Sequence, residues 1–317
     1  MGVRPRPRSR VNPAARHALA FLALTLAVSS CGGRPAAAFD GKRAQKWVER
    51  QVAFGPRAPG TPAHDSCFAF LAASLARFAP VVEADTFNYR SPELGKEVRL
   101  MNVLARFEPK ERKRILLGAH WDTRAWADRD PNPARRHLPI LGANAGGSGV
   151  AVLLALAQIL SRRKPALGVD IVFFDGEDLG TEKNPSGYFR GSNQYVAWRS
   201  TEEGPLFVVI LDMVGARGAE FWWEGNSQER ASNIVDLVWA RARRERVPQF
   251  KSGVKHSIYD DHIPFLNAGI PAIDIIDFDY PEWHTHGDTL AIIDPLTLEG
   301  VGRVLESLVT EADFLTD

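Results

Sequence analysis

The sequence alternates short, unbroken apolar runs with longer helical segments, and this alternation constrains the fold more than any other feature. Strands are expected over five runs: 98–106, 114–119, 169–174, 206–211 and 272–276. Helices are expected between and after them, over 149–160, 193–199, 230–246 and 296–314. Continuous apolar strands are typical of a parallel sheet covered on both faces. The sequence therefore predicts an α/β fold, a three-layer sandwich with a mostly parallel central sheet flanked by helices.

Polar side chains follow several of these expected strands at the point where each strand ends. His120 comes directly after the run 114–119, Glu177 and Asp178 follow 169–174, and Asp212 follows 206–211. In open α/β sheets, sites form in the crevice at the carboxyl ends of the strands. Each residue alone could be an ordinary loop residue. Several acids and a histidine at one sheet edge together predict a functional site.

These residue types suit a metal centre. A catalytic zinc ion takes three protein ligands of nitrogen or oxygen type and leaves one position open. Neighbouring side chains of an extended segment point in opposite directions, so one of Glu177 and Asp178 can bind metal while the other faces substrate as a base. Gly176, which precedes them, lets the chain turn sharply. The candidate ligands are His120, Asp178, Asp212 and His284.

A second group of acidic residues stands at Asp260 and Asp261, directly before His262. One interpretation is that either aspartate caps the N-terminus of a helix. The other is that a carboxylate is placed here to relay protons. The spacing leaves both interpretations open.

Five segments occur in an order that resembles the glutaminyl-peptide cyclotransferases and their relatives, the zinc aminopeptidases of the same fold. The similarity runs from about residue 45 to 315 and implies the zinc aminopeptidase-like fold. The early segment Phe54–Gly60 is similar too. The five segments are Gly118–Thr123, Phe173–Asp178, Leu211–Gly215, Asp260–Leu266 and Trp283–Thr285.

The resemblance implies roles for the residues that carry it. Asp178 matches the acidic zinc ligand, and His284 matches the histidine ligand. Glu177 matches the general acid and base. One zinc ion is the cofactor that this resemblance implies.

Four further positions take roles from the same resemblance. Asp260 and Asp212 match the aspartates of the cyclases' proton-relay network. Trp283 matches the aromatic residue that lines the substrate pocket. His120 and Asp212 match the residues that hold a second zinc in two-metal aminopeptidases, and the cyclases have them without a second metal.

The chain departs from the family pattern at one zinc ligand. The family places an aspartate, a principal ligand, within the pattern Gly-Ala-x-Asp-x-x-Ser-Gly. Here Ala145 occupies that position, and a methyl group cannot bind metal. The amide oxygen of the adjacent Asn144 is a weaker candidate ligand. We expect zinc to bind weakly or not at all, unless the His120 and Asp212 side of the site is recruited.

Three functions are compatible with these residues. A glutaminyl-peptide cyclotransferase would form N-terminal pyroglutamate and release ammonia, and peptides or proteins that begin with Gln would be its substrates. A zinc aminopeptidase would use the same residues to cleave the first peptide bond. An inactive binding module of the cell envelope is the third hypothesis, motivated by Ala145. The resemblance of Asp260–Leu266 to the cyclases, and Trp283 beside His284, favour the cyclotransferase.

The N-terminus predicts export. Residues 1–30 hold five arginines, no acid and an apolar run over 18–28, which together are typical of a signal peptide. The segment 26–31 resembles a bacterial lipoprotein box, in which Cys31 would carry the lipid. The alternative is an ordinary secretory signal. We therefore expect a signal peptide over 1–30, a tether over 31–44 and a catalytic domain over 45–317, exported as a periplasmic or cell-envelope lipoprotein or secreted.

The charge balance limits the partners. After residue 30 the chain holds 34 basic against 38 acidic residues, which argues against nucleic acid. Membrane contact is expected only through a lipid at Cys31. The remaining cysteine, Cys67, is expected to be buried and structural. The basic run 241–246 is expected to be a solvated helix face.

Overall fold

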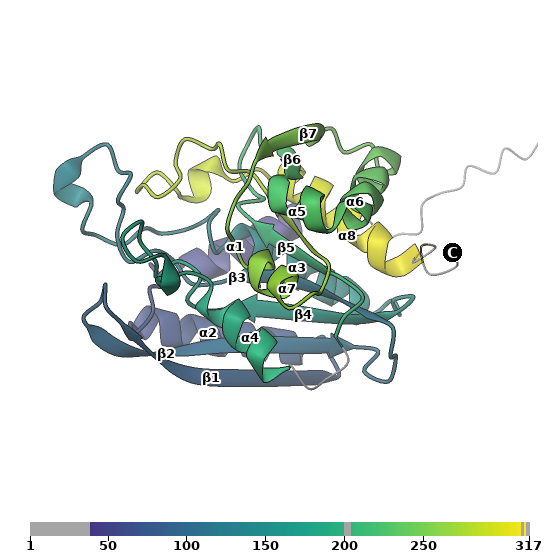
Figure 1. Ribbon diagram of the computed structural model, residues 1–317, viewed down its shortest axis with the longest axis horizontal. Coiled ribbons are helices and arrows are strands. Elements are labelled where there is room, and N and C mark those ends of the chain that lie inside the picture. Colours follow the sequence, from purple (N-terminus) through teal and green to yellow (C-terminus); the bar gives the residue numbers. More distant parts are fainter. Residues whose placement is uncertain (1–38, 200–203, 312–313, 315–317) are drawn as a thin grey trace, which may run out of the picture. The chain divides into compact units, whose positions relative to one another are not determined.

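A six-stranded mixed sheet forms the centre of the fold (Figure 1). The structure is a computed structural model, and it describes residues 39–199, 204–311 and 314. The strand order is β1-β2-β4-β3-β5-β8, and the four strands β4, β3, β5 and β8 run parallel. The strands are β1 Val81–Ser91, β2 Lys96–Phe107, β3 Arg114–His120, β4 Gly168–Phe174, β5 Val208–Asp212 and β8 Ala272–Ile276.

The predicted α/β class is confirmed, and the sheet differs from the expectation at one edge. Strands β1 and β2 are antiparallel to each other, and β2 is antiparallel to β4. Strand β1 was not predicted, because it lacks a continuous apolar run. Its residues instead alternate between partly buried and exposed positions, as in an edge strand with one covered face.

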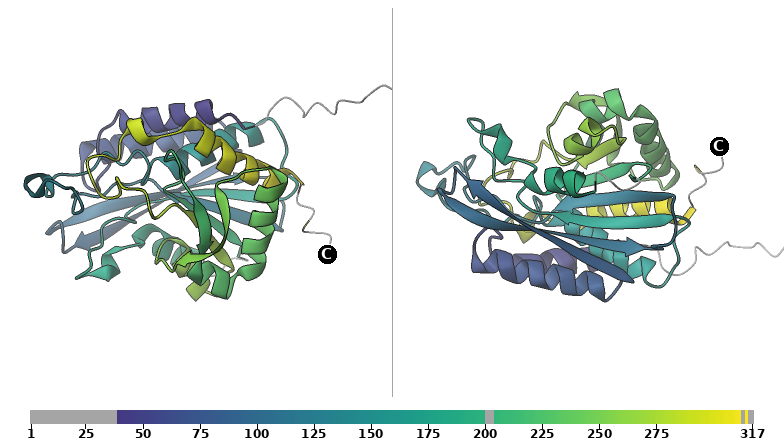
Figure 2. Two further views of the ribbon diagram at one scale, coloured as in Figure 1. Left: turned by 90° about the horizontal axis from the view of Figure 1, so that it is seen from above. Right: turned by 60° about the horizontal axis from the view of Figure 1, so that its bottom comes forward.

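Helices cover both faces of the sheet (Figure 2). Helices α1, α2, α3 and α8 lie on one side, and α4 and α7 lie on the other. A two-stranded parallel sheet, β6 Phe221–Glu224 with β7 Phe250–His256, lies beyond β8. The helices are α1 Gly41–Val52, α2 Pro62–Ala76, α3 Ser148–Leu160, α4 Arg190–Trp198, α5 Gly225–Arg230, α6 Ser232–Arg244, α7 His262–Asn267 and α8 Pro295–Glu311.

The folded domain begins before residue 45, where the tether was expected to end. Phe39 is buried, and its backbone nitrogen donates a hydrogen bond to Glu306 of α8 at 2.9 Å. Asp40 caps α1 by accepting from the backbone nitrogens of Lys42 and Arg43. The expected signal peptide over 1–30 and the lipid site at Cys31 lie outside the described residues. Among the helices that are described, none has both the length and the apolar character needed to cross a bilayer.

Helix α3 approaches the sheet closely at its N-terminus, where it follows the loop that carries Ala145. A β-carbon at Gly149 would lie 2.4 Å from the carbonyl oxygen of Leu211 and 2.9 Å from the β-carbon of Ala119. Only glycine therefore permits this approach. The packing places the Ala145 loop at the carboxyl ends of β3 and β5.

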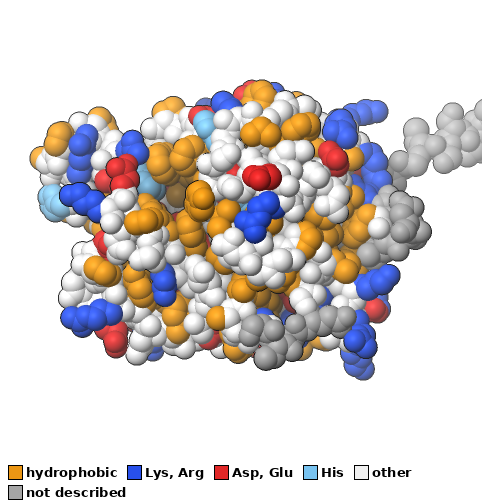
Figure 3. All heavy atoms as spheres, viewed as in Figure 1, with side chains coloured by type: hydrophobic (Ala, Val, Ile, Leu, Met, Phe, Trp, Pro, Cys, Tyr) orange, Lys and Arg blue, Asp and Glu red, His pale blue; other side chains and the backbone are white. Residues whose placement is uncertain are grey.

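Two smaller expectations have different outcomes. Cys67 is fully buried, as predicted for a structural cysteine. The basic run 241–246 is not a uniformly solvated face, because Arg241 is buried and pairs with Glu311 of α8 at 2.8 Å. Arg244 contacts the same carboxylate. On the face shown in Figure 3, basic and acidic side chains are interspersed among hydrophobic ones.

Candidate active site

The strand ends open into a pocket of about 490 Å³. His120 is the last residue of β3, Asp212 the last of β5 and Ile276 the last of β8. Glu177 and Asp178 follow the end of β4, after a turn at Gly176 with φ of 70°. The pocket brings together the residues selected from the sequence: His120, Ala145, Glu177, Asp178, Asp212, Asp260, Trp283 and His284.

Strained backbone is concentrated at this pocket. Five non-glycine residues of the described chain have positive φ, and three of them line the pocket. These three are Phe189, Met213 and His284, with φ between 52° and 56°. Such conformations persist only where the surrounding structure holds them, and they are common at functional sites.

His120 and Asp212 form a buried pair on one side of the pocket. Nε2 of His120 lies 3.0 Å from Asp212 and Nδ1 lies 3.5 Å from Asp122. Burial lowers the pKa of His120, but the two carboxylates outweigh it and raise the pKa well above its ordinary value. His120 and Asp212, which match the second metal site of the two-metal aminopeptidases, thus contact each other directly.

Asp178 and His284 lie next to each other in the same pocket, and each is contacted by a further charged side chain. Nη1 of Arg124 donates to Asp178 at 2.6 Å, and Nδ1 of His284 lies 3.1 Å from Asp128. Nε2 of His284 lies 3.7 Å from Asp178, so the two candidate ligands are neighbours. Burial raises the pKa of Asp128, but hydrogen bonds from His284 and Arg124 lower it well below its usual range.

Ala145 stands where a third ligand would be required. It is buried against the pocket, and its backbone nitrogen and that of Asn144 donate to Asp288 at 3.1 and 2.7 Å. Asn144 does not serve as a substitute ligand here, because its amide oxygen accepts from the backbone nitrogen of Gly215 at 2.8 Å.

The donor set therefore does not fit a complete three-ligand zinc centre. Within the described residues, no three histidine, cysteine, aspartate or glutamate side chains are grouped so that they could hold one metal ion. A catalytic zinc needs three protein ligands, and this side of the pocket offers Asp178 and His284.

Glu177 is held for proton transfer by its surroundings. The backbone nitrogens of Glu177 and Asp178 donate to the two oxygens of Asp122 at 3.1 and 3.3 Å, which fixes the turn after β4. Burial raises the pKa of Glu177 well above its ordinary value, and the carboxylates of Asp178 and Asp260 add to this, while His120 opposes it. A carboxyl group with a raised pKa can both accept and donate a proton near neutral pH.

Asp260 lines the pocket and belongs to a group of buried acidic residues that includes Asp261 and Asp274. Burial and the neighbouring Asp212 raise the pKa of Asp260 to about 6. Asp261 accepts a hydrogen bond from Ser192 at 2.5 Å, and it makes no side-chain cap on α7. Asp261 thus stands at the N-cap position of α7, as one interpretation expected, but its side chain does not cap the helix, and the side chain of Asp260 accepts from the backbone nitrogen of Asp261. Behind Asp260 lies Asp274, and His262 pairs with Glu224 at 3.0 Å.

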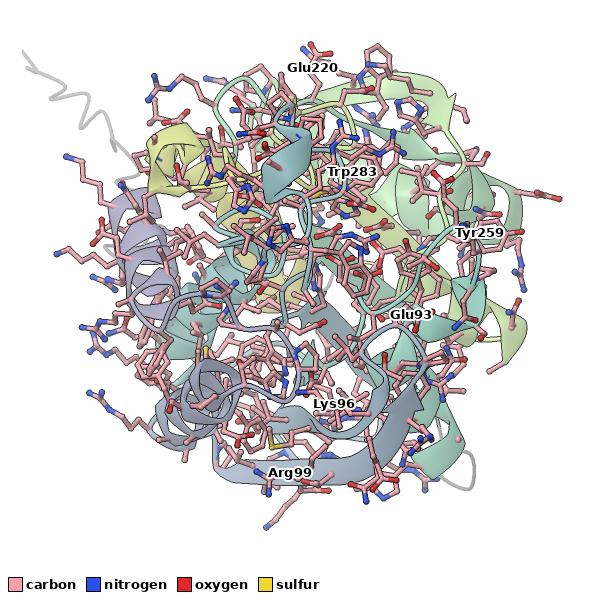
Figure 4. All side chains as sticks on the ribbon, turned by 90° about the vertical axis from the view of Figure 1, so that its left-hand side faces the viewer. Glu93, Lys96, Arg99, Glu220, Tyr259 and Trp283 are labelled. Atoms are coloured by element: carbon pink, nitrogen blue, oxygen red, sulfur yellow. The ribbon has the colours of Figure 1, made fainter. Side chains whose placement is uncertain are left out.

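Aromatic and aliphatic side chains form the other wall. Trp283 packs against Phe278 with ring centroids 4.8 Å apart and against His284 at 4.1 Å. Tyr259 is 72% exposed at the pocket rim. Trp283 and Tyr259 come from different segments and are both visible in Figure 4. The pocket thus offers an apolar surface in addition to its carboxylates.

Several residues that support the site were missed from the sequence. Arg124 and Asp128 follow β3 in the loop that begins after His120, so the strand-end rule that identifies His120 and Asp122, extended along that loop, would have found them. Asp274 interrupts an apolar strand, and a charged residue in such a run is itself a signal. Arg57 lies in the segment Phe54–Gly60 but carries no comparable signal in the sequence.

The sequence of this chain matches the model of peptidase family M28 over residues 102–309. The chain belongs to this family. Among solved structures, the M28 domain is similar to a glutaminyl cyclase of Bacteroides thetaiotaomicron bound to N-acetylhistamine, with 35% identity and a TM-score of 0.83. That match covers 86% of this chain and 98% of the other.

Other similar proteins represent both activities considered from the sequence. A Zn-dependent exopeptidase from Parabacteroides distasonis is 34% identical, with a TM-score of 0.81, over 86% of this chain and 99% of the other. A glutaminyl-peptide cyclotransferase of Drosophila melanogaster is 27% identical over 286 residues, which are 81% of this chain and 77% of the relative. The M28 assignment confirms the resemblance on which the site residues were selected.

Proposed function

We propose that this M28 protein is a glutaminyl-peptide cyclotransferase that acts on peptides and proteins beginning with Gln. One observation carries the proposal. Glu177 and Asp260 lie in the same pocket as the apolar wall of Trp283, in a chain that matches 98% of the length of a solved glutaminyl cyclase. A small glutamine side chain suits a pocket with one acidic and one aromatic wall.

The reaction joins the α-amine to the γ-carboxamide carbon of the same glutamine. The new C–N bond closes the ring, and the side-chain nitrogen leaves as ammonia. Glu177 accepts a proton from the attacking amine and returns it to the leaving nitrogen, so its own charge is unchanged after one turnover. The carboxylate of Asp260 helps to raise the pKa of Glu177, which favours the protonated form that donates.

The apolar wall and the buried acids orient the substrate. Trp283 and Phe278 contact the aliphatic part of the side chain and exclude water around the reacting carbon. The carboxylates attract the positively charged N-terminus of a peptide. In a complete centre a bound metal would polarise the carbonyl. Because Ala145 supplies no ligand, we expect turnover well below that of a chain with aspartate there.

The test offers the purified protein two substrates. A Gln-initiated peptide should release ammonia and lose 17 Da in mass, about the mass of that ammonia, and an aminoacyl-anilide should stay intact. Cleavage of the anilide without ammonia release would instead support the aminopeptidase. The matched control is a peptide that begins with Asn, whose shorter side chain would have to close a smaller ring.

A second candidate function is favoured by Ala145. The pocket could bind peptide N-termini without turning them over. Saturable binding of the Gln-initiated peptide with no ammonia release, even after long incubation, would support this binding module over the enzyme.

We further propose that the protein is exported and anchored through a lipid at Cys31. The basic and apolar pattern of residues 1–30 supports this proposal. Labelling with a radioactive fatty acid should mark the chain and should fail for Cys31→Ser. Recovery of an unlabelled wild-type chain from the soluble periplasm would favour an ordinary secretory signal.

A further inference from the structure

The guanidinium of Arg124 is shared between two carboxylates behind the pocket. Nε and Nη2 donate to the two oxygens of Asp128 at 3.0 and 2.7 Å. Nη1 donates to Asp178 at 2.6 Å and to the carbonyl of Gly180 at 3.2 Å. Arg124 is 1% exposed and Asp178 is buried, whereas the side chain of Asp128 is 41% exposed, so of the two carboxylate contacts only that with Asp178 is shielded from water. The rigid fork of an arginine suits this geometry, and a lysine could not reproduce it.

Asp128 extends this contact to His284. A carboxylate can only accept, so Nδ1 of His284, 3.1 Å away, carries the hydrogen. In the neutral ring, Nε2 then has the free electron pair, and this nitrogen lies 3.7 Å from Asp178 on the pocket side. One guanidinium thus contacts Asp178 directly and reaches His284 through Asp128.

We infer that Arg124 and Asp128 are positioning residues for Asp178 and His284, and that the metal centre is interrupted at Ala145 alone. The two ligand side chains are already neighbours and are hydrogen-bonded from behind, as ligands of intact metal sites are. The inference deepens the proposed function and rests on it for the use of the pocket. The test measures the zinc dissociation constant and the tautomer of His284. Its result can therefore be interpreted even if the protein does not cyclise glutamine.

The loop at Ala145 is also held in place. Both its backbone nitrogen and that of Asn144 bind the buried carboxylate of Asp288. The phenol of Tyr280 donates to the same carboxylate at 3.2 Å. These hydrogen bonds hold the backbone at position 145 in place beside the pocket, so a side chain introduced there would have a defined position.

The experiment measures the zinc dissociation constant by competition with a chromophoric chelator. Ala145→Asp should bind zinc at least about 100-fold more tightly than the unaltered chain, because a direct ligand contributes more than its supporting contacts. Adding Asp128→Asn to that variant should weaken binding about 10–100-fold. Adding Arg124→Lys should weaken it at least as much, because both ligands lose a contact.

The matched control is Asp130→Asn in the same background. Asp130 lies two residues further along, contacts His286 at 2.6 Å and does not contact His284. It should leave the zinc constant unchanged. No gain in affinity for Ala145→Asp would overturn the inference, and so would equal effects of the Asp128 and Asp130 substitutions.

A second measurement needs no metal and no change at Ala145. Nitrogen chemical shifts of the His284 ring should show a hydrogen on Nδ1 in the unaltered chain and in Asp130→Asn. Asp128→Asn should produce a mixture of the two tautomers. An unchanged His284 tautomer in Asp128→Asn would contradict the positioning role.

Discussion

Nε2 of His64, on α2, lies 2.9 Å from both carboxylate oxygens of Asp175, and both residues are fully buried. Asp175 also accepts from the backbone nitrogen of Met101 at 2.7 Å and stands two residues before Glu177. The ring of His64 stacks on Trp121 at 4.4 Å. The pair thus ties helix α2 to the end of β4, from which the catalytic turn begins.

Breaking this pair should be costly. His64→Leu would leave Asp175 without its buried partner, so the free energy of unfolding should fall by about 3–5 kcal/mol. Urea denaturation monitored by tryptophan fluorescence measures the change. His256→Leu, in the exposed pair of His256 with Asp279, should cost no more than about 1 kcal/mol. Similar losses for the two variants would contradict the importance of the buried pair.

Arg57 should matter for the loop that carries Ala145. Its guanidinium is fully buried and donates to the carbonyls of Trp121, Leu141 and Gly142 at 3.1, 2.9 and 2.7 Å. Lysine has one donor group at its tip and cannot serve all three, so Arg57→Lys should lower stability by about 2–4 kcal/mol. Amides of residues 141–145 should also exchange faster with deuterium. The control is Arg50→Lys on α1, which should leave both readouts unchanged.

Asp277 should make stability depend on pH. Burial and the nearby carboxylate of Asp279 raise its pKa to about 6, above its value in an unfolded chain. The folded state therefore holds the proton more tightly, and this contribution is complete below about pH 4 and is lost as the pH rises through about 6. Asn cannot ionise. The free energy of unfolding of Asp277→Asn minus that of wild type should therefore be larger at pH 8 than at pH 4, by about 1–3 kcal/mol.

Denaturation curves at the two pH values measure this difference directly. Asp236→Asn, on the exposed face of α6, is the control for the loss of one charge. A pH-independent difference between wild type and Asp277→Asn would show that Asp277 does not hold its proton in the folded protein.

Glu177→Gln tests the working carboxylate. The amide keeps the shape of the side chain but cannot take a proton, so cyclisation of a Gln-initiated peptide should slow by about 100–10,000-fold. Peptide affinity, measured calorimetrically, should change little. Glu182→Gln in the exposed loop beside the pocket is the matched control and should keep full activity. Retained activity in Glu177→Gln would remove this residue from the mechanism.

The central strands and the pocket residues could be predicted from the sequence because they follow local rules. Apolar runs identified β2, β3, β4, β5 and β8, and polar residues that end or follow β3, β4 and β5 lie in one pocket. The antiparallel edge was missed because β1 is half exposed and carries no such run. Helix α1 was missed although its buried residues have the spacing of an amphipathic helix, because its first turn falls within the expected tether 31–44.

The supporting contacts could not be predicted, because they join residues far apart in the chain. Asp288 binds the backbone at Asn144 across 144 positions, and Arg124 reaches Asp178 across 54. Spacing within one segment carries no information on such pairs. The loss of a family zinc ligand at Ala145, in contrast, was visible in the sequence. The structure adds that the amide oxygen of Asn144 already accepts a hydrogen bond from the backbone of Gly215.

Ammonia release by the unaltered protein and by Ala145→Asp, each with added zinc and with a chelator, tests the central claim most directly. We predict slow release from a Gln-initiated peptide by the unaltered protein, insensitive to the chelator. We predict faster release by Ala145→Asp, which the chelator should reduce to the unaltered rate. Equally fast, chelator-sensitive release by both proteins would contradict the account, because Ala145 would then not occupy the place of a missing ligand.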